Sequence, residues 1–169
     1  MKSRTTILTA AAASLAAITS ASAEEAPWQP VSGEGIHYFS TSVKHSEAPT
    51  ETGAVIRSTD IVSLTGDLTG TVLYHPVTVI DGAAGTLNNS GYQVFSGTVL
   101  GGEPVLLLDD SFSFEVLLAT GTANGTVILD QTLAGPPTVC KLTVNGDGTM
   151  TEDGDSLFTY EGECQVEAR

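Results

Sequence analysis

The sequence predicts an all-β protein, built as a closed antiparallel meander β-barrel of about eight strands, with a β-sandwich as the alternative. Three observations support this fold class. No segment beyond residue 33 has the pattern of a helix. Runs rich in Thr, Val and aromatic residues alternate with turn residues about every ten positions, as in all-β proteins. A Gly-Thr-Val-aliphatic segment also recurs, beginning at Gly70, Gly97 and Gly125.

The expected strands follow one another with short turns between them. They cover residues 35–45, 53–64, 68–81, 90–100, 105–120, 126–133, 138–144 and 158–166. Parallel neighbours would need long crossover connections, so we expect each strand to pair antiparallel with its neighbours in sequence. A sheet of this size keeps two unpaired edges unless it closes into a barrel or divides into two packed sheets.

The three Gly-Thr-Val segments are spaced by 27 and 28 residues (97 − 70 and 125 − 97). Two strands with their turns need about 25 residues at ordinary strand lengths. Glycine relieves crowding where a strand bends, as at the corner of a barrel. We therefore interpret the repeat as structural, with one glycine bend in each hairpin of a closing barrel.

The N-terminal segment has the pattern of a signal peptide. Lys2 and Arg4 precede an apolar stretch over 7–18, and Ala21-Ser22-Ala23 fits the cleavage pattern. The apolar stretch is short for a membrane-spanning anchor helix, which is the alternative. The expected organisation is a signal peptide over 1–23, an N-terminal arm over 24–34 that contains Pro27 and Pro30, and a single barrel domain over 35–169. The expected location is secreted or periplasmic, with no membrane association after cleavage.

The composition is strongly acidic, with 20 Asp and Glu residues against six Lys and Arg and a formal net charge of −14. Two of the six basic residues lie in the expected signal peptide. Nucleic acid binding depends on Lys and Arg contacts to phosphate, so we expect no nucleic acid partner. The balance suits a soluble exported protein.

Two cysteines, Cys140 and Cys164, are present. An isolated pair in an exported chain is typical of one disulfide, whereas structural zinc needs four ligands. The midpoint of the pair is residue 152, within the polar stretch 145–156. A hairpin centred there would place the two cysteines opposite each other on the last two strands and secure the closing seam. The acidic residues of this stretch lack the spacing of an EF-hand loop, so we expect a hairpin loop without metal; a calcium site in the loop is the alternative.

Several segments resemble the allene oxide cyclase-like barrel superfamily, which includes dirigent-like proteins. They are Gly66-Asp67-Leu68-Thr69-Gly70, Phe95-Ser96-Gly97, and the long apolar strand with its glycine hairpin at 121–129. The likeness extends over residues 35–133, whereas the cysteine hairpin departs from it. The resemblance implies an eight-stranded barrel with an apolar cavity that is open at one end. It also implies binding of a hydrophobic small molecule, in some members with a cyclisation catalysed mostly by positioning the substrate, without a cofactor.

Three polar residues on predicted strands are candidates for catalysis. Glu115 lies in the apolar stretch 112–118, and burial in a cavity would raise its pKa, as suits a general acid; on the outer face it would be ordinary surface. Tyr74 and His75 point to opposite faces of their strand, so one of them is a possible donor inside the cavity. Solvent exposure of His75 is the alternative.

The expected ligand-binding side chains are mostly aromatic: Tyr92, Phe95, Phe112, Phe114 and His37. In a small barrel such side chains can equally form the core. Three functions therefore remain open: a carrier of a hydrophobic small molecule, a cofactor-free cyclase or isomerase on the same barrel, and a non-catalytic envelope or extracellular interaction protein with a filled core. The sequence contains no nucleophile elbow, zincin motif or P-loop.

Overall fold

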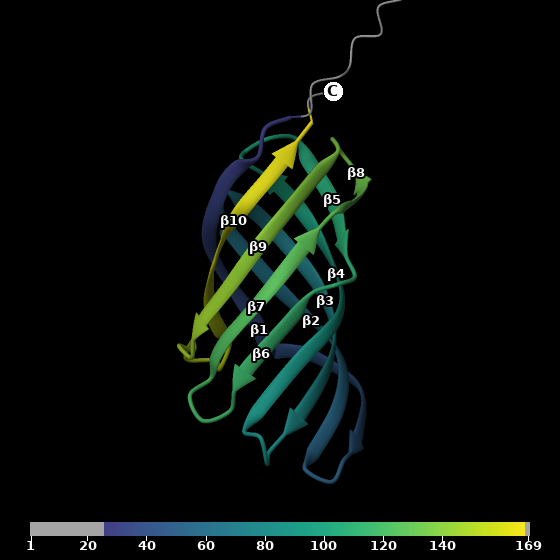
Figure 1. Cartoon of the computed structure of the whole chain (residues 1–169), viewed down its shortest axis with the longest axis vertical. Helices are drawn as coiled ribbons and strands as arrows, with labels where there is room; N and C mark the ends of the chain where they lie inside the picture. The colour runs from purple at the N-terminus through teal and green to yellow at the C-terminus, as the bar shows by residue number, and fades with distance from the viewer. Residues whose placement is uncertain (1–25, 168–169) are drawn as a thin grey trace, which may run out of the picture.

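The computed structural model describes residues 26–167, which form ten strands and no helix (Figure 1). The strands are β1 (Gln29–Pro49), β2 (Gly53–Gly66), β3 (Leu68–Asp81), β4 (Thr86–Val99), β5 (Pro104–Asp109), β6 (Ser113–Leu117), β7 (Thr122–Leu129), β8 (Gln131–Ala134), β9 (Thr138–Asp147) and β10 (Ser156–Val166). Within this range there is accordingly no helix that meets the length and hydropathy of a membrane span.

Eight of the strands form a closed ring in the order β3-β2-β1-β10-β9-β7-β6-β4, and β4 pairs with β3 to complete it. Every pairing is antiparallel, as the short turns require. The two further strands lie outside the ring, where β5 pairs with the second half of β4 and β8 pairs with β5. The predicted antiparallel barrel is confirmed, and the sandwich alternative is wrong.

The eight predicted strands are all present, but two of them are interrupted. The segment predicted over 105–120 is divided into β5 and β6, and the segment over 126–133 into β7 and β8. Asp109 lies at the first interruption and is fully buried. Its carboxylate accepts hydrogen bonds from the backbone N–H of Ser111 at 2.7 Å and of Ile128 at 3.0 Å. At the break between β5 and β6, these two backbone N–H groups therefore donate to a side chain and not to the backbone of a neighbouring strand. A side-chain acceptor of this kind competes with strand pairing for backbone donors.

The first strand begins earlier than expected. Residues 29–34, assigned to an arm by the two prolines, belong to β1 and pair with β10 from Gln29↔Cys164 onward. Pro30 is accommodated because it lies at the beginning of the strand, where one missing donor matters little. The N-terminal strand thus closes the barrel against the C-terminal strand. The predicted signal peptide lies outside the described residues.

The interior is apolar, and several of its fully buried side chains lie toward the end of the barrel that carries the disulfide, the upper end in Figure 1. Leu68, Phe95 and Leu107 have no exposed surface there. The hydroxyl of Tyr160 accepts a hydrogen bond from the backbone N–H of Leu68 at 2.8 Å and lies 3.1 Å from the carbonyl oxygens of Thr65 and Leu68. The side chain of Tyr160 therefore holds the β2–β3 turn against the inside of the barrel.

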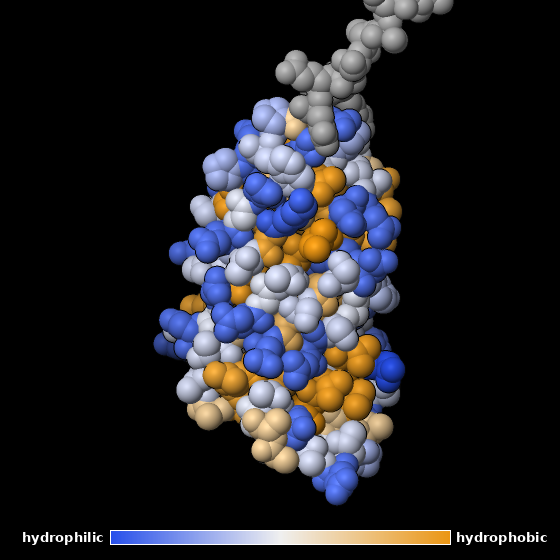
Figure 2. Space-filling model, in the orientation of Figure 1, coloured by the Kyte–Doolittle hydropathy of each residue, from blue (hydrophilic) through white to orange (hydrophobic). Residues whose placement is uncertain are grey.

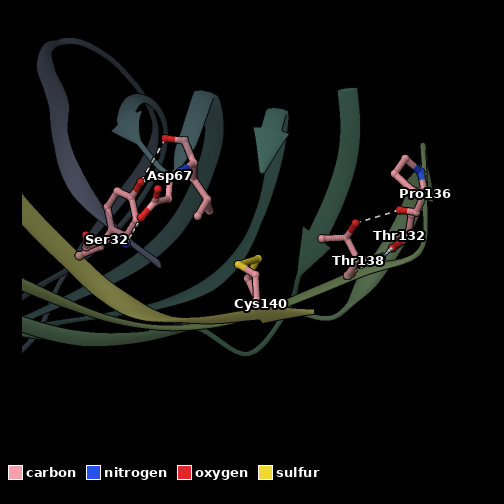
Figure 3. Close-up of a disulfide and its surroundings, with 9 residues drawn as sticks. Ser32, Asp67, Thr132, Pro136, Thr138 and Cys140 are labelled. Carbon is pink, nitrogen blue, oxygen red and sulfur yellow. Dashed lines mark hydrogen bonds between the residues drawn. A yellow bond between two sulfur atoms is a disulfide. The ribbon is translucent and has the colours of Figure 1, made fainter. Parts of the chain in front are cut away.

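Two further contacts close this end (Figure 3). The backbone N–H of Ser32 donates to the carboxylate of Asp67 at 2.8 Å, which ties β1 to the β2–β3 turn. Cys140 and Cys164 face each other in the β9–β10 register and form the predicted disulfide, with both cysteines fully buried. The bridge joins β9 to β10, whereas the seam between the first and last strands is closed by the β1–β10 ladder.

The Gly-Thr-Val glycines allow close approach between neighbouring strands. Gly70 on β3 pairs directly with Gly97 on β4, and a Cβ added to Gly70 would lie 2.3 Å from the carbonyl oxygen of Ser96. A Cβ on Gly125 would lie 2.0 Å from the ring of Phe114 on β6. None of the three has the positive φ that favours glycine. The repeat is structural, as predicted, but its reason is lack of room for a side chain.

Candidate functional site

The barrel encloses a cavity of about 260 Å³ that extends from Leu129, the register partner of Cys140, to Met150 of the β9–β10 loop. Six of the lining side chains are aliphatic and come from four strands, β2, β3, β7 and β9: Val62, Leu64, Val72, Val127, Leu142 and Val144. They alternate with outward residues along each strand, so they face inward by the period-two rule. The cavity is large enough for a small molecule and is predominantly apolar.

The mouth of the cavity lies where β1 and the β9–β10 loop approach each other. Phe39 of β1 and Met150 of the loop both line the cavity, yet each is 48% exposed. Apolar side chains also reach the surface nearby on β6, where Leu117 is exposed, and Figure 2 shows apolar surface toward this lower end of the barrel. Exposed aromatic and thioether groups beside an interior cavity are typical of a ligand-binding mouth.

A bulge in β1 shapes this mouth. Tyr38 pairs with Ile61, and the next pair is Val43 with Thr59, so four residues of β1 lie opposite Asp60 alone. Bulges of this kind redirect side chains and are common beside functional sites. The backbone N–H of Ser40, within the bulge, donates to Asp155 at 2.9 Å, which ties the bulge to the end of the β9–β10 loop.

Asp60 organises the bulge from inside the barrel. Asp60 is 3% exposed. Its carboxylate is hydrogen-bonded to the Nε2 atom of His37 at 3.1 Å and accepts hydrogen bonds from the hydroxyls of Ser42 and Ser58. Burial by itself raises the pKa of Asp60, but these hydrogen bonds and the charge of His37 together lower it below its ordinary value. The residue is therefore an ionised carboxylate that orients the imidazole of His37 at the cavity wall.

An aromatic cluster surrounds the inner end of the bulge. Tyr74 is its centre, with ring centroids 4.7 Å from Phe112, 6.2 Å from Phe114 and 5.3 Å from His37. The ring of His37 also lies 4.0 Å from that of Phe39 at the mouth. Such tilted and edge-on arrangements are favourable for aromatic pairs. The members of the cluster on β1, β3 and β6 form one wall of the cavity, whereas Phe112 precedes β6 and packs against Tyr74.

Tyr74 is a neutral phenol in this wall. Burial raises its pKa far above the ordinary value, a hydrogen bond with the Asn89 side chain works in the opposite direction, and the charges of Asp60 and Asp109 raise it further. A phenol held neutral at all ordinary pH values can donate a hydrogen bond but cannot serve as a base. The wall thus offers a polar group without adding charge to the cavity.

The predicted site residues are divided between the two faces of the barrel. His37, Tyr74 and Phe114 line the cavity. Phe95 and Phe112 are buried in the core, with at most 2% of their surface exposed, and Phe112 contacts Tyr74. These five residues face inward, as an interior site requires.

Three predicted site residues lie on the outer face. Glu115 is exposed, because the alternation of β6 turns Phe114 and Val116 inward and Glu115 outward.

Tyr92 is 49% exposed and stacks on His75, with ring centroids 4.5 Å apart. The Nδ1 atom of His75 lies 2.9 Å from the hydroxyl of Thr59, again outside the barrel. Of the three proposed catalytic side chains, Tyr74 alone therefore reaches the cavity.

Sequence reasoning missed the polar residues of the interior. Asp60 and Asp109 are buried carboxylates, and Asn89 and Gln93 line the cavity. A period-two signal was available for Asp60, because Ser58, Asp60 and Val62 share a face on β2. No such signal marks Asn89, since it lies among polar neighbours just before the strand predicted over 90–100.

The described residues contain no cluster of three or more His, Cys, Asp or Glu side chains with the spacing of a metal site. Comparison with protein-family models, with curated proteins and with solved structures finds no match to this chain. The site is therefore assigned from its geometry.

Proposed function

We propose that this protein binds a small, predominantly apolar molecule inside the barrel. The observation that supports the proposal is the interior cavity of about 260 Å³, lined mainly by aliphatic and aromatic side chains and open at the Phe39–Met150 mouth. Burial of apolar ligand surface in such a cavity supplies the binding free energy. The resemblance of residues 35–133 to allene oxide cyclase-like barrels supports the same function, as does the closed barrel.

The proposal includes export to an oxidising compartment, either the periplasm or the cell exterior. The Cys140–Cys164 disulfide is weak support, because such bonds persist in oxidising environments, and the N-terminal pattern over 1–23 is consistent with it. An exported barrel of this kind would carry its ligand outside the cytoplasm.

A second function, cofactor-free cyclisation or isomerisation of the bound molecule, is favoured by one arrangement. Ionised Asp60 is bonded to Nε2 of His37, and the imidazole lines the cavity beside the neutral phenol of Tyr74. A carboxylate that orients a histidine is a common device for proton transfer. Here His37 would exchange the proton, Tyr74 would hold a substrate oxygen, and the apolar walls would restrain the substrate conformation.

Binding can be tested by calorimetric titration with 1-octanol and by thermal unfolding. A bound ligand stabilises the folded state in proportion to RT ln(1 + [L]/Kd), about 2.7 kcal/mol at a hundredfold excess over Kd. Val127→Phe, which fills part of the cavity, should abolish both effects. Ile128→Phe, at the neighbouring outward position, should preserve them.

Native mass spectrometry of the protein purified from its own host provides an independent readout. A co-purifying small molecule lost from Val127→Phe and retained by Ile128→Phe is the expected result. Absence of any bound molecule together with no response to 1-octanol would overturn the proposal and favour a packed, non-binding interaction protein.

A further inference from the structure

Two polar side chains lie side by side in the cavity wall at the inner end of the β1 bulge. The imidazole of His37, on β1, and the phenol of Tyr74, on β3, both line the cavity. Their ring centroids are 5.3 Å apart, and the rings meet edge-on at 80°. At this spacing one small molecule can contact both groups at once, as a reaction that uses two polar side chains requires.

The contact with Asp60 decides which nitrogen of His37 can act as a base. The ionised carboxylate lies 3.1 Å from Nε2 and can only accept a hydrogen bond, so we assign the ring hydrogen to Nε2. In the neutral imidazole the free lone pair is then on Nδ1. Within the described range Nδ1 has no hydrogen-bond partner, yet it is not one of the buried atoms left unpartnered, so it keeps accessible surface.

The phenol of Tyr74 supplies a hydrogen-bond donor beside this base. Burial raises the pKa of Tyr74 far above its ordinary value, so the phenol keeps its proton, whereas the hydrogen bond with the Asn89 side chain acts in the opposite direction. A bond that lowers the pKa favours the phenolate, so the Asn89 amide is the donor and the Tyr74 oxygen is the acceptor. The hydrogen of the phenol itself is therefore available to an oxygen atom of a bound molecule.

The charges around this pair favour a neutral substrate. Within residues 26–167 no Lys or Arg lines the cavity, and the ionised Asp60 contacts His37. An anion would enter without a partner, which is costly in a medium of low dielectric constant. Among neutral organic molecules, a ketone offers both features that the pair can use: an oxygen that accepts a hydrogen bond, and acidic C–H groups next to the carbonyl group.

We propose that the barrel catalyses proton transfer at the carbon next to the carbonyl group of a small neutral ketone. Nδ1 of His37 is the base, and the hydroxyl of Tyr74 donates to the carbonyl oxygen. The inference rests on the proposed function, because it specifies the substrate class and the reaction of the same cavity. Asp60 accepts the Nε2 hydrogen and stabilises the imidazolium that forms.

The reaction moves a proton and a double bond and needs no co-reactant. Nδ1 takes a proton from the carbon next to the carbonyl group, so a C–H bond breaks and an N–H bond forms. The electron pair of the C–H bond forms the C=C bond of an enolate, and negative charge develops on the oxygen, where Tyr74 donates. In a β,γ-unsaturated ketone the imidazolium returns the proton to the γ carbon. The product is the conjugated isomer, and neutral imidazole is restored.

Cyclohex-3-en-1-one is the probe for this reaction. The cavity of about 260 Å³ has room for roughly nine heavy atoms, since a water molecule takes about 30 Å³ of the liquid, and this ketone is smaller. Its isomerisation to cyclohex-2-en-1-one is followed by the ultraviolet absorbance of the conjugated enone. The unsubstituted protein should accelerate the reaction beyond an equal concentration of free imidazole in the same buffer, because it holds the base and the donor on one substrate molecule.

Two substitutions test the assigned roles. Tyr74→Phe removes the hydroxyl and should lower kcat by about 100-fold or more, the usual loss for one donor to a developing oxyanion. His37→Gln removes the base and should lower kcat by a similar factor. Tyr92→Phe and His75→Gln make the same changes on the outer face and should keep the rate of the unsubstituted protein. Calorimetric binding of cyclohex-2-en-1-one identifies the variants that retain a folded cavity.

The outcomes separate this inference from the proposed function. Binding of cyclohex-2-en-1-one by the unsubstituted protein without isomerisation of cyclohex-3-en-1-one would overturn the inference and leave the binding function in place, as would binding of 1-octanol without binding of the enone. A rate unchanged by either Tyr74→Phe or His37→Gln would overturn the role of that residue and with it the inference. Failure of both the enone and 1-octanol to bind would overturn the proposed function itself.

Discussion

The ring of Phe114 on β6 lies directly over Gly125 on β7, and the two residues are paired in the strand register. A Cβ on Gly125 would come within 2.0 Å of that ring. The same ring lines the cavity and belongs to the aromatic wall around Tyr74. The third Gly-Thr-Val segment therefore contributes to the site indirectly, by making room for one of its aromatic side chains.

Gly125→Ala should destabilise the protein by about 1 to 3 kcal/mol, because the added methyl group forces Phe114 out of its position. Denaturant unfolding at equilibrium measures the change. Gly146→Ala is the matched control, since its Cβ would meet the nearest atom at 3.4 Å, an ordinary contact. Combining Gly125→Ala with Phe114→Leu should recover part of the loss. Equal stability of the two alanine variants would contradict the explanation.

Tyr160→Phe should destabilise the protein by about 1 to 3 kcal/mol, because it leaves the buried N–H of Leu68 without its acceptor. Hydrogen exchange should show the largest loss of protection in the β2–β3 turn, whose carbonyl oxygens also contact the hydroxyl. Tyr92→Phe, on the exposed outer face, is the control and should change stability little. A uniform loss of protection over the whole barrel would argue against a local role for Tyr160.

Replacement of both cysteines by alanine should lower the free energy of unfolding by about 3 kcal/mol, the chain-entropy value for a loop of this length. The two cysteines are 24 residues apart and fully buried. The folded protein should therefore resist reduction until it unfolds, which alkylation after reductant treatment can measure. Rapid reduction of the native protein would contradict the buried position of the bridge.

Asp60→Asn should destabilise the protein at neutral pH, because the carboxylate holds both ends of the β1 bulge through His37 and Ser42. The folded-state pKa of Asp60 is lowered, so the folded protein releases this proton more readily than the unfolded chain. Its contribution to stability is therefore fully present above the ordinary pKa of about 4 and is lost as the pH falls below that value.

Denaturant unfolding at pH 7 and at acid pH measures this dependence. The stability difference between the unsubstituted protein and Asp60→Asn should shrink as the pH is lowered below the ordinary aspartate pKa. Asp110→Asn, which removes an exposed carboxylate, corrects for general charge effects. A difference that stays constant with pH would show that the effect of Asp60 does not depend on its ionisation.

Most of the fold could be predicted from local patterns. Alternating strands, short turns and the need to close two open edges lead to an antiparallel barrel, and the hairpin between Cys140 and Cys164 predicts their bridge. The interruption at Asp109 could not be predicted, because it depends on backbone donors from Ser111 and Ile128 that only the folded barrel brings to this carboxylate. The strand character of residues 29–34 was missed for a similar reason: its partner, β10, is at the other end of the chain.

The candidate site was predicted less completely. Period-two alternation shows that Tyr74 and His75 face opposite sides, and that Phe114 and Glu115 do as well, but it does not say which side is inside. Barrel closure decides this, and it turns Tyr74 and Phe114 inward and Glu115 outward.

Local patterns in the chain are enough to predict the all-β class, the antiparallel order of the strands and the cysteine pairing, because each depends on residues close in the chain or on simple alternation. Only the folded barrel establishes the inner face, the Asp60–His37 contact across the β1 bulge, and the place of Asn89 in the cavity wall with Tyr74. These features depend on which side chains meet across a closed barrel, and such contacts have no local signature in the chain.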